Sequence, residues 1–395
     1  MKANDINPSR QLSMRVDDEG LLIHWDDGHI SRYPNLWLRE RCACELCGTS
    51  WTGIRFLEPG HIATRVRIAK AHIHAQKELR IDWLDDGHQS RYPLQWVRDN
   101  CLTKASRDQR RHHPKIWGSE LNKALPCLDY ENIFTSDRTR FKAFECIRDR
   151  GFVRLTGGPS RPGEAERLAS LIGPLEVTNF GAVFDLKVTP GATAIGATAA
   201  PATLHTDDSY RNMPTGIKSI HCLTPADPDT GYTVLVDGFK VGQVLSKEAP
   251  EAFELLCTQP LWFHRYYEDA HLRARACVFT RDECGEVVGF RFQDRSLGPF
   301  DVEPEKFEAL FGAVCTLIEV LRRETLQVKF RLEAGDAVLF DNHRVLHSRT
   351  AFTGTQRHLQ LCSVNRDTFL SQLRVLGRHY APHSTNLTLP RGALA

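Results

Sequence analysis

The triplet His205-Thr206-Asp207 is the first segment whose residue types and spacing suggest chemistry. Alternate residues of a β-strand point to one face of a sheet, so an imidazole and a carboxylate with this spacing can bind one metal ion together. The triplet alone is a weak signal. In a chain with 17 His and 49 acidic residues, roughly two His-x-acid triplets are expected by chance. A metal site therefore needs a third ligand elsewhere in the sequence.

His347 is the candidate for that third ligand. It follows a turn at Gly335-Asp336 and an apolar, strand-like run. Two His and one carboxylate on one face of a metal ion form the facial triad typical of Fe(II) oxygenases, which leaves positions open for oxygen chemistry. Zinc hydrolases also keep an open position. The triad by itself therefore does not decide between oxidation and hydrolysis.

Arg357 favours oxidation. It lies ten residues beyond His347, at the start of another apolar run. A guanidinium can bind a carboxylate through two parallel hydrogen bonds. One strand away from the metal, it would hold the distal carboxylate of 2-oxoglutarate, whose other end chelates iron, and Thr233 could add a hydroxyl donor. The predicted cofactor is Fe(II), with 2-oxoglutarate and O₂ as cosubstrates.

A second metal site is predicted by three closely spaced cysteines, Cys42, Cys44 and Cys47. Three thiolates within six residues can approach one ion at the Zn–S distance of about 2.3 Å. A fourth ligand is needed, and the spacing leaves His29 and His88 as equivalent candidates, with Cys101 as a competing one. A closed site of three Cys and one His has no open position, so its role should be structural.

The elements around the cysteines form an internal repeat. Residues 26–34 recur as residues 85–93, at an offset of 59 residues, and the match extends to Trp37/Trp96, Arg39/Arg98 and Cys42/Cys101. Each copy follows an apolar run, at 21–25 and 79–83, and contains the Asp-Gly turn of a β-hairpin. We therefore expect a small β-rich domain of two related hairpin units.

The elements around the iron triad are expected to be short strands with helices between them. We expect strands at 152–155, 217–223, 232–236, 328–332, 337–340 and 358–364, and helices at 138–150, 163–171, 247–257 and 304–321. This order favours a jelly-roll barrel over a parallel α/β sheet. The polar and basic segment 106–114 reads as a linker. The predicted domains are thus 1–104, a linker at 105–125, and 126–395, in a mainly β chain with flanking helices (α+β).

Composition excludes several classes of partner. With 51 Lys and Arg against 49 acidic residues and a net charge of +2, no general attraction for nucleic acid or anionic lipid is available. No apolar stretch approaches the ~20 residues of a membrane span, and residues 1–11 lack a signal-peptide core. The 12 cysteines need not form disulfides in a chain of this length. We expect a cytoplasmic protein that acts on a small molecule.

The ordered motifs of the chain together resemble the gamma-butyrobetaine hydroxylase family. They are His205-Thr206-Asp207, Pro214-x-Gly216, His221-Cys222, Val236-Asp237-Gly238-Phe239, Phe340-Asp341-Asn342, His347-x-Arg349 with Arg357 and, in the front domain, Leu36-Trp37-Leu38-Arg39 before the cysteines. The resemblance implies a double-stranded β-helix as catalytic domain, His88 as the fourth zinc ligand, and a homodimer. It also assigns Ile220 to the 2-oxoglutarate site.

The resemblance further implies a substrate with a trimethylammonium group held by aromatic rings. Phe180 and Phe184 occupy two positions of that cage, and Tyr210 is a further candidate ring. The chain departs from the family at Ala197 and Ser363, where it lacks two tyrosines, and at Asp294, which replaces an asparagine near the substrate carboxylate. We therefore expect a small polar amine or quaternary ammonium metabolite, with gamma-butyrobetaine itself at best a slow substrate.

Two other functions are compatible with parts of the pattern. An inactive scaffold on the same fold would be expected to have lost the triad or Arg357, and both are present. A zinc hydrolase would use the triad and leave Arg357 without a role. Oxidative decarboxylation of 2-oxoglutarate to succinate and CO₂, coupled to hydroxylation, gives a role both to the triad and to Arg357.

Overall fold

The structure is a computed structural model that describes residues 12–42, 44–48, 54–62, 64–188, 198–354, 356–382 and 384. It divides into two compact units, Met1–His112 with Ala381–Ala395, and His113–Tyr380. The range expected to be a linker contains α3 (Lys104–Arg110) and η2 (Ser119–Lys123). The charge run forms a helix because Thr103 caps it and Arg110 donates to the carbonyls of Asp99 and Cys101, both at 2.8 Å.

In the first unit, each copy of the repeat forms a three-stranded antiparallel sheet and a short helix. The elements are β1 (Ser13–Asp17), β2 (Gly20–His24), β3 (Ile30–Pro34), α1 (Asn35–Glu40), η1 (Pro59–His61), β4 (Ile68–His74), β5 (Glu78–Trp83), β6 (Gln89–Pro93) and α2 (Leu94–Asp99). Strands β2 and β5 bury alternate apolar side chains in a shared core. Gly28 and Gly87 take positive φ angles in the two Asp-Gly turns.

The two copies exchange equivalent contacts. Tyr33 donates its hydroxyl to the carbonyl of Val97 at 2.5 Å, and Tyr92, its counterpart, donates to the carbonyl of Leu38. In the same way Arg39 pairs with Asp86 at 2.7 Å, and Arg98 pairs with Asp27 at 2.8 Å. The two halves are therefore related by an approximate two-fold relation.

The second unit is built on two sheets. The six-stranded sheet has the order β7-β8-β17-β10-β19-β9, and the three-stranded sheet has the order β16-β11-β18. Their strands are β7 (Cys127–Asp129), β8 (Phe152–Thr156), β9 (Val183–Lys187), β10 (Ile217–Thr224), β11 (Thr233–Asp237), β16 (Gln327–Phe330), β17 (Ala337–Asp341), β18 (Val345–Arg349) and β19 (His358–Val364). Apolar side chains from both sheets pack together in one core cluster. This arrangement agrees with the expected β-rich barrel.

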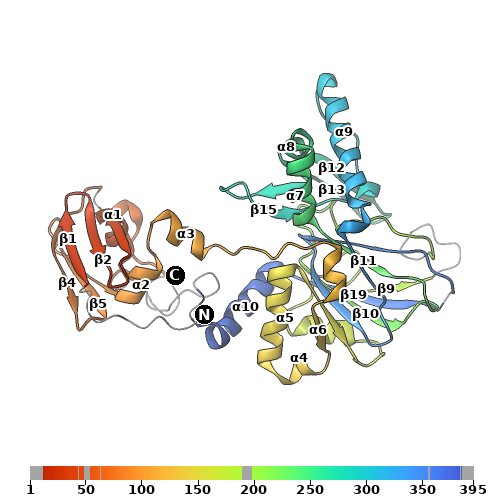
Figure 1. The fold of residues 1–395 in the computed structure, drawn as a ribbon, viewed down its shortest axis with the longest axis horizontal. Coiled ribbons are helices and arrows are strands. Elements are labelled where there is room, and N and C mark those ends of the chain that lie inside the picture. The colour runs from red at the N-terminus through yellow and green to blue at the C-terminus, as the bar shows by residue number, and fades with distance from the viewer. Residues whose placement is uncertain are drawn as a thin grey trace. The chain divides into compact units, whose positions relative to one another are not determined.

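Helices and two hairpins surround these sheets. The helices are α4 (Asn132–Thr135), α5 (Asp137–Arg150), α6 (Glu164–Ser170), α7 (Gly238–Glu248), α8 (Pro250–Thr258), α9 (Pro304–Leu321) and α10 (Arg366–Tyr380). The hairpins are β12 (Leu261–Tyr266) with β13 (His271–Ala276), and β14 (Phe279–Arg281) with β15 (Val287–Phe290); η4 (Asp294–Ser296) and η5 (Glu324–Leu326) are short turns of helix. Figure 1 shows α4, α5, α6 and α10 gathered together, and α7, α8 and α9 grouped near β12 and β13.

One expected helix is divided into two in the structure. The helix expected at 247–257 is the end of α7 followed by α8, because Pro250 has no backbone N–H to continue α7 and instead opens α8. Among the described helices, none combines the length and apolar character needed to cross a bilayer.

A buried ion pair fixes the loop before β18. Arg344 donates to both carboxylate oxygens of Asp237, at 3.0 and 2.8 Å, and their side chains are only 2% and 0% exposed. Its remaining N–H groups donate to the carbonyls of Asp149 and Lys115 at 2.8 and 3.0 Å. These bonds tie together four segments just before the strand that carries His347.

Candidate functional site

His205 and His347 face each other across a pair of extended segments. The N–H of His205 donates to the carbonyl of His347 at 3.1 Å, and the N–H of His347 donates back at 2.9 Å. Directly opposed residues of an antiparallel pair project to the same face. The two ring centroids are accordingly 4.4 Å apart, which brings both imidazoles to one side of the barrel interior.

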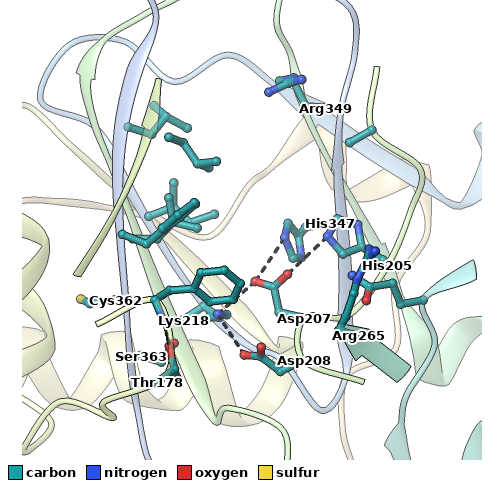
Figure 2. A pocket seen from close by; sticks show the side chains of 18 of the residues that line it. Thr178, His205, Asp207, Asp208, Lys218, Arg265, His347, Arg349, Cys362 and Ser363 are labelled. Atoms are coloured by element: carbon teal, nitrogen blue, oxygen red, sulfur yellow. Dashed lines mark hydrogen bonds and ion pairs between the residues drawn. The ribbon is translucent and has the colours of Figure 1, made fainter. Parts of the chain in front are cut away.

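Asp207 completes the cluster. Its carboxylate lies 3.3 Å from Nε2 of His205 and 3.7 Å from Nε2 of His347, and one donor atom from each residue lies within 4.8 Å of the other two. Figure 2 shows both imidazoles directed at this carboxylate. The three residues that the spacing singled out are thus brought together.

Neighbouring residues hold the cluster in place. The side chain of Asn342 accepts from the N–H of Asp207 at 2.7 Å and donates to the carbonyls of Asp207 and Thr215 at 3.0 and 2.9 Å. Nδ1 of His205 lies 2.7 Å from the carbonyl of Thr203. That bond fixes the ring so that Nε2 faces the cluster, as is usual for metal-binding His. Two imidazoles and one carboxylate, held in this way, fit Fe(II).

The protonation states suit metal binding. Burial alone would raise the pKa of Asp207. The charges of Lys218 and His347 and the hydrogen bond from His205 outweigh this effect and hold the pKa well below its usual value. Burial lowers the pKa of His347 to about 3. Burial also acts to lower the pKa of His205, but its hydrogen bond to Asp207 raises that pKa overall. An ionised carboxylate and a neutral imidazole are the forms that bind metals.

Lys218 is a neighbour that sequence reasoning missed. Its ammonium lies 3.0 Å from Oδ2 of Asp207 and 3.7 Å from Oδ2 of Asp208, as Figure 2 shows. Asp208 has a positive φ of 60°, unusual for a residue other than glycine, and this turn places consecutive carboxylates beside one ammonium. The signal in the sequence was a charged residue near the start of the apolar run of β10.

The cluster opens into a cavity of about 610 Å³ within the second unit. The cavity is lined by nine of the residues expected to bind metal, cosubstrate or substrate, namely His205, Asp207, His347, Arg357, Thr233, Ile220, Phe180, Phe184 and Tyr210. Residues far apart in the sequence therefore share one cavity beside the candidate metal ligands.

Arg357 is a buried cation in the wall of this cavity. It is 8% exposed, and its guanidinium lies over the ring of Phe352 at 5.2 Å. Burial and, after it, the charge of Arg349 lower its pKa to about 10, so it remains protonated at neutral pH. Among the described residues, no carboxylate pairs with it. A buried cation of this kind requires an anionic partner, and the distal carboxylate of 2-oxoglutarate fits that requirement.

Two aromatic residues that were not expected, Tyr266 and Tyr267, also line the cavity. Phe180 and Phe184 have centroids 5.3 Å apart, and Tyr267, just after β12, meets Phe180 edge-on at 5.4 Å. Tyr210 is buried, and its hydroxyl donates to Asp208 at 3.1 Å. Ser363 also lines the cavity, whereas Ala197 lies outside the described residues. No periodic pattern in the sequence pointed to Tyr267.

Asp294 is not among the residues that line the cavity. Its carboxylate accepts from the hydroxyl of Thr203, which does line the cavity, and from the N–H of Arg295, both at 2.8 Å. Its chain neighbours Gln293 and Arg295 line the cavity instead. The reason is local: the turn of η4 directs consecutive side chains to different sides.

The cysteine cluster of the first unit is assembled as a second candidate metal site. Nε2 of His88 lies 3.2, 3.5 and 3.6 Å from the sulfurs of Cys42, Cys44 and Cys47. His29 lies elsewhere, with its Nε2 3.1 Å from the sulfur of Cys101. The geometry therefore favours His88 over both His29 and Cys101, which the spacing had left open. Three thiolates and one imidazole fit a structural zinc.

Comparisons with known proteins cover nearly the whole chain. Residues 110–363 match the family described as taurine catabolism dioxygenase TauD, TfdA family, and residues 12–98 match the gamma-butyrobetaine hydroxylase-like N-terminal family. A gamma-butyrobetaine dioxygenase of Pseudomonas sp. (strain AK-1) is 33% identical over 91% of this chain and 94% of its own.

Two further relatives are similar over most of their length. The gamma-butyrobetaine dioxygenase of Homo sapiens is 30% identical over 90% of this chain and 93% of its own. A trimethyllysine dioxygenase of Meyerozyma guilliermondii is 27% identical over 91% of this chain and 94% of its own.

Proposed function

Because this chain belongs to the TauD, TfdA family of dioxygenases and carries a gamma-butyrobetaine hydroxylase-like N-terminal domain, we propose that it hydroxylates a small polar metabolite beside the triad of His205, Asp207 and His347. It is an enzyme that depends on Fe(II), 2-oxoglutarate and O₂, as dioxygenases of this family do. The observation that supports the assignment of its site is the placement of the triad and Arg357 in one cavity.

In this proposal each residue has one task. His205, Asp207 and His347 hold Fe(II), and Arg357 binds the distal carboxylate of 2-oxoglutarate, with Thr233 and Ile220 beside it. The bound iron and cosubstrate supply the oxidising power for the reaction. The chain itself positions the substrate and excludes water. Asn342 keeps the loop of Asp207 in register with β17, and Lys218 balances the charge of its carboxylate.

Phe180, Phe184 and Tyr267 bind the apolar or cationic end of the substrate in this proposal. Ring faces attract a quaternary ammonium group without requiring hydrogen bonds. Relatives named for gamma-butyrobetaine and trimethyllysine support a substrate with such a group. The third ring, Tyr267, compensates in part for the tyrosine missing at Ser363.

The remaining assignments concern the whole protein. Cys42, Cys44, Cys47 and His88 hold a structural zinc, and two chains associate as a homodimer. Size-exclusion chromatography with light scattering tests directly whether the protein is a homodimer. A mass of one chain across a hundredfold range of concentration would contradict it.

The test of the proposed site is spectroscopic. Fe(II) and then 2-oxoglutarate are added without oxygen, and the weak visible charge-transfer band of their chelate is recorded. We expect the band in the unchanged protein and its loss in Asp207→Ala. An inactive scaffold with a damaged site would give no band, and a zinc hydrolase would bind Zn(II) without any effect of 2-oxoglutarate. Either outcome would contradict the proposal.

A further inference from the structure

The first unit contains a second pair of cysteine and histidine, to which no function described so far gives a role. Nε2 of His29 lies 3.1 Å from the sulfur of Cys101. This distance is close to the 3.2 Å between Nε2 of His88 and the sulfur of Cys42 at the candidate zinc site. Each member of one pair is the counterpart of a member of the other at the repeat offset of 59 residues. The second copy of the repeat thus keeps the first two elements of a metal site.

The residues after Cys101 also correspond to ligands of the first site. At the same offset of 59 residues, Thr103 is the counterpart of Cys44 and Ser106 is the counterpart of Cys47. The hydroxyl of Thr103 lies 3.4 Å from the sulfur of Cys101 and donates to the hydroxyl of Ser106 at 3.0 Å. Two hydroxyl groups therefore stand where the first site has two further thiols.

The backbone of the two segments forms the same turn. The N–H of Gly48 donates to the carbonyl of Cys44 at 3.1 Å, and the N–H of Arg107 donates to the carbonyl of Thr103 at 2.9 Å. These two bonds join counterpart residues, since each pair is related by the same offset. The second copy therefore keeps the local geometry of the metal site as well as one thiol and one imidazole.

Cys101 is held as a thiolate. Burial alone would raise the pKa of its thiol, but hydrogen bonds from Ser31, Thr103 and His29 outweigh burial and lower that pKa to about 6. The hydroxyl of Ser31 donates to the sulfur at 3.1 Å. Cys101 is completely buried, whereas His29 is partly exposed. A thiolate is the form of cysteine that binds metal ions.

A thiolate and an imidazole together are suited to a divalent ion such as Zn(II). Zinc sites with four strong ligands are closed, whereas a site with fewer protein ligands keeps positions open for water. Neutral hydroxyls bind such an ion less strongly than thiolates do. The residue types of the second copy therefore favour an ion that is held less tightly than the ion of the first copy and that exchanges with solution.

We propose that Cys101 and His29 bind a divalent ion of the Zn(II) type at a second, open site in the first unit. The ion takes the place of the proton between Nε2 of His29 and the sulfur of Cys101, with the hydroxyls of Thr103 and Ser106 beside it. It joins the turn before β3 to the segment between α2 and α3. With two strong ligands instead of four, the second site loses its ion on dialysis and the zinc cluster does not.

Co(II) is the probe for this site. Its bond to a thiolate gives a charge-transfer band in the near ultraviolet, which the iron triad cannot give because it contains no sulfur. Co(II) also binds less tightly than Zn(II) and leaves the zinc cluster occupied. The dialysed full chain is titrated with Co(II) without oxygen, while a colorimetric indicator records any zinc that is released. We expect the band to grow with Co(II) while no zinc is released.

The variants of this titration remove one ligand at a time. The band should be lost in Cys101→Ser, and the Kd for Co(II) should rise about tenfold or more in His29→Gln, since even a residue that only supports a ligand is worth such a factor. Cys284→Ser is the matched control. It removes an exposed cysteine in the turn between β14 and β15 and should keep the full band.

A second test does not depend on the folding of Cys101→Ser. The double substitution Thr103→Cys with Ser106→Cys gives the second copy the ligand types of the first. If the four positions surround one ion, the second site becomes closed and keeps its metal. We expect two zinc ions per chain after dialysis in this variant, against one in the unchanged protein, by elemental analysis.

The possible results separate this site from the zinc cluster. Absence of the thiolate band in the unchanged protein, or its persistence in Cys101→Ser, overturns the second site. A single zinc per chain in the double variant also overturns it, since the four positions would then not meet at one ion. Failure of the zinc cluster shows separately, as absence of zinc in the dialysed unchanged protein. The part of the band that depends on Cys101 then decides on the second site by the same criteria.

Discussion

At the scale of single residues, the site depends on how Asp207 is held. Its backbone is bonded in both directions to Asn342, while its carboxylate meets two imidazoles and Lys218. The residue is therefore placed by groups from β10, from β18 and from the turn after β17. Such convergence leaves the carboxylate little freedom, which suits a ligand that must present the same atoms to a metal in every turnover.

We predict that Asp207→Ala abolishes turnover and leaves the fold intact. The substitution removes one of the three proposed metal ligands but no large apolar contact, since the side chain is 21% exposed. Succinate release measures turnover, and circular dichroism with thermal unfolding measures the fold. Asp269→Ala, an exposed carboxylate just after β12, serves as control and should behave like the unchanged protein. Full succinate release by Asp207→Ala would remove this residue from the site.

We predict that Arg357→Lys raises the KM for 2-oxoglutarate about tenfold or more. A lysine keeps the charge but cannot make two parallel hydrogen bonds to a carboxylate, and one charged hydrogen bond is worth at least about 1.4 kcal/mol. The variant should regain most of its kcat at saturating 2-oxoglutarate. An unchanged KM would place the anchor elsewhere. Arg281→Lys, at an exposed pair with Glu254, is the matched control.

The sequence identified many residues that line the cavity, from strand spacing and from the order of motifs along the chain, and it missed Arg265, Arg295 and Tyr267. His205 and Asp207 are two residues apart, so strand geometry alone pairs them. Arg265, Arg295 and Tyr267 reach the cavity only because the β12 hairpin and η4 come together. No local pattern records that approach.

At the scale of elements, continuous apolar runs predicted strands well. The bounds of β19 and α9 agree with expectation, and those of β10, β11, β16 and β17 differ by one or two residues. The hairpin β12–β13 was not expected, because charged residues interrupt its pattern on both strands. All but the end of α7 was missed as well, since this helix starts with a glycine that only the Asp237 cap and the packing of Phe290 explain.

We predict that Arg344→Met destabilises the second unit by about 3–5 kcal/mol, because it leaves the buried carboxylate of Asp237 without its cation. Chemical denaturation followed by fluorescence measures the change. Arg281→Met breaks an exposed ion pair of similar length and should cost about 1 kcal/mol or less. Equal losses of unfolding free energy in the two variants would contradict a special role for the buried pair of Arg344 and Asp237.

The cluster of Cys42, Cys44, Cys47 and His88 joins the segment after α1 to the turn before β6. We predict that it binds one zinc per chain, separately from iron. Elemental analysis should find that zinc is lost in Cys44→Ser and in His88→Ala and retained in His29→Ala, because only His88 faces the three sulfurs. Retention of one equivalent in Cys44→Ser would show that the cluster is misassigned. The opposite result for the two histidines would move the fourth ligand to the other copy of the repeat.

At the scale of the whole molecule, each unit has its own apolar core. Separate cores allow separate unfolding. We predict that a strong zinc chelator lowers the melting temperature of one calorimetric transition, that of the first unit, and leaves the second near its original temperature. Metal removal takes away binding free energy that only the folded first unit gains. A single transition that shifts as a whole would show that the two units unfold together.

The reciprocal contacts within the first unit make its two copies depend on each other. His88 of one copy faces Cys42 of the other, while His29 faces Cys101, and each tryptophan-serine bond has its mate, Trp25 to Ser31 and Trp83 to Ser90, both at 2.8 Å. Neither half could complete its own cysteine-histidine pair. A single copy of the repeat would therefore need a second copy opposite it to complete either pair, so the two copies depend on each other. Cys44 and Cys47 extend only the pair of Cys42 and His88 to four candidate ligands among the described residues.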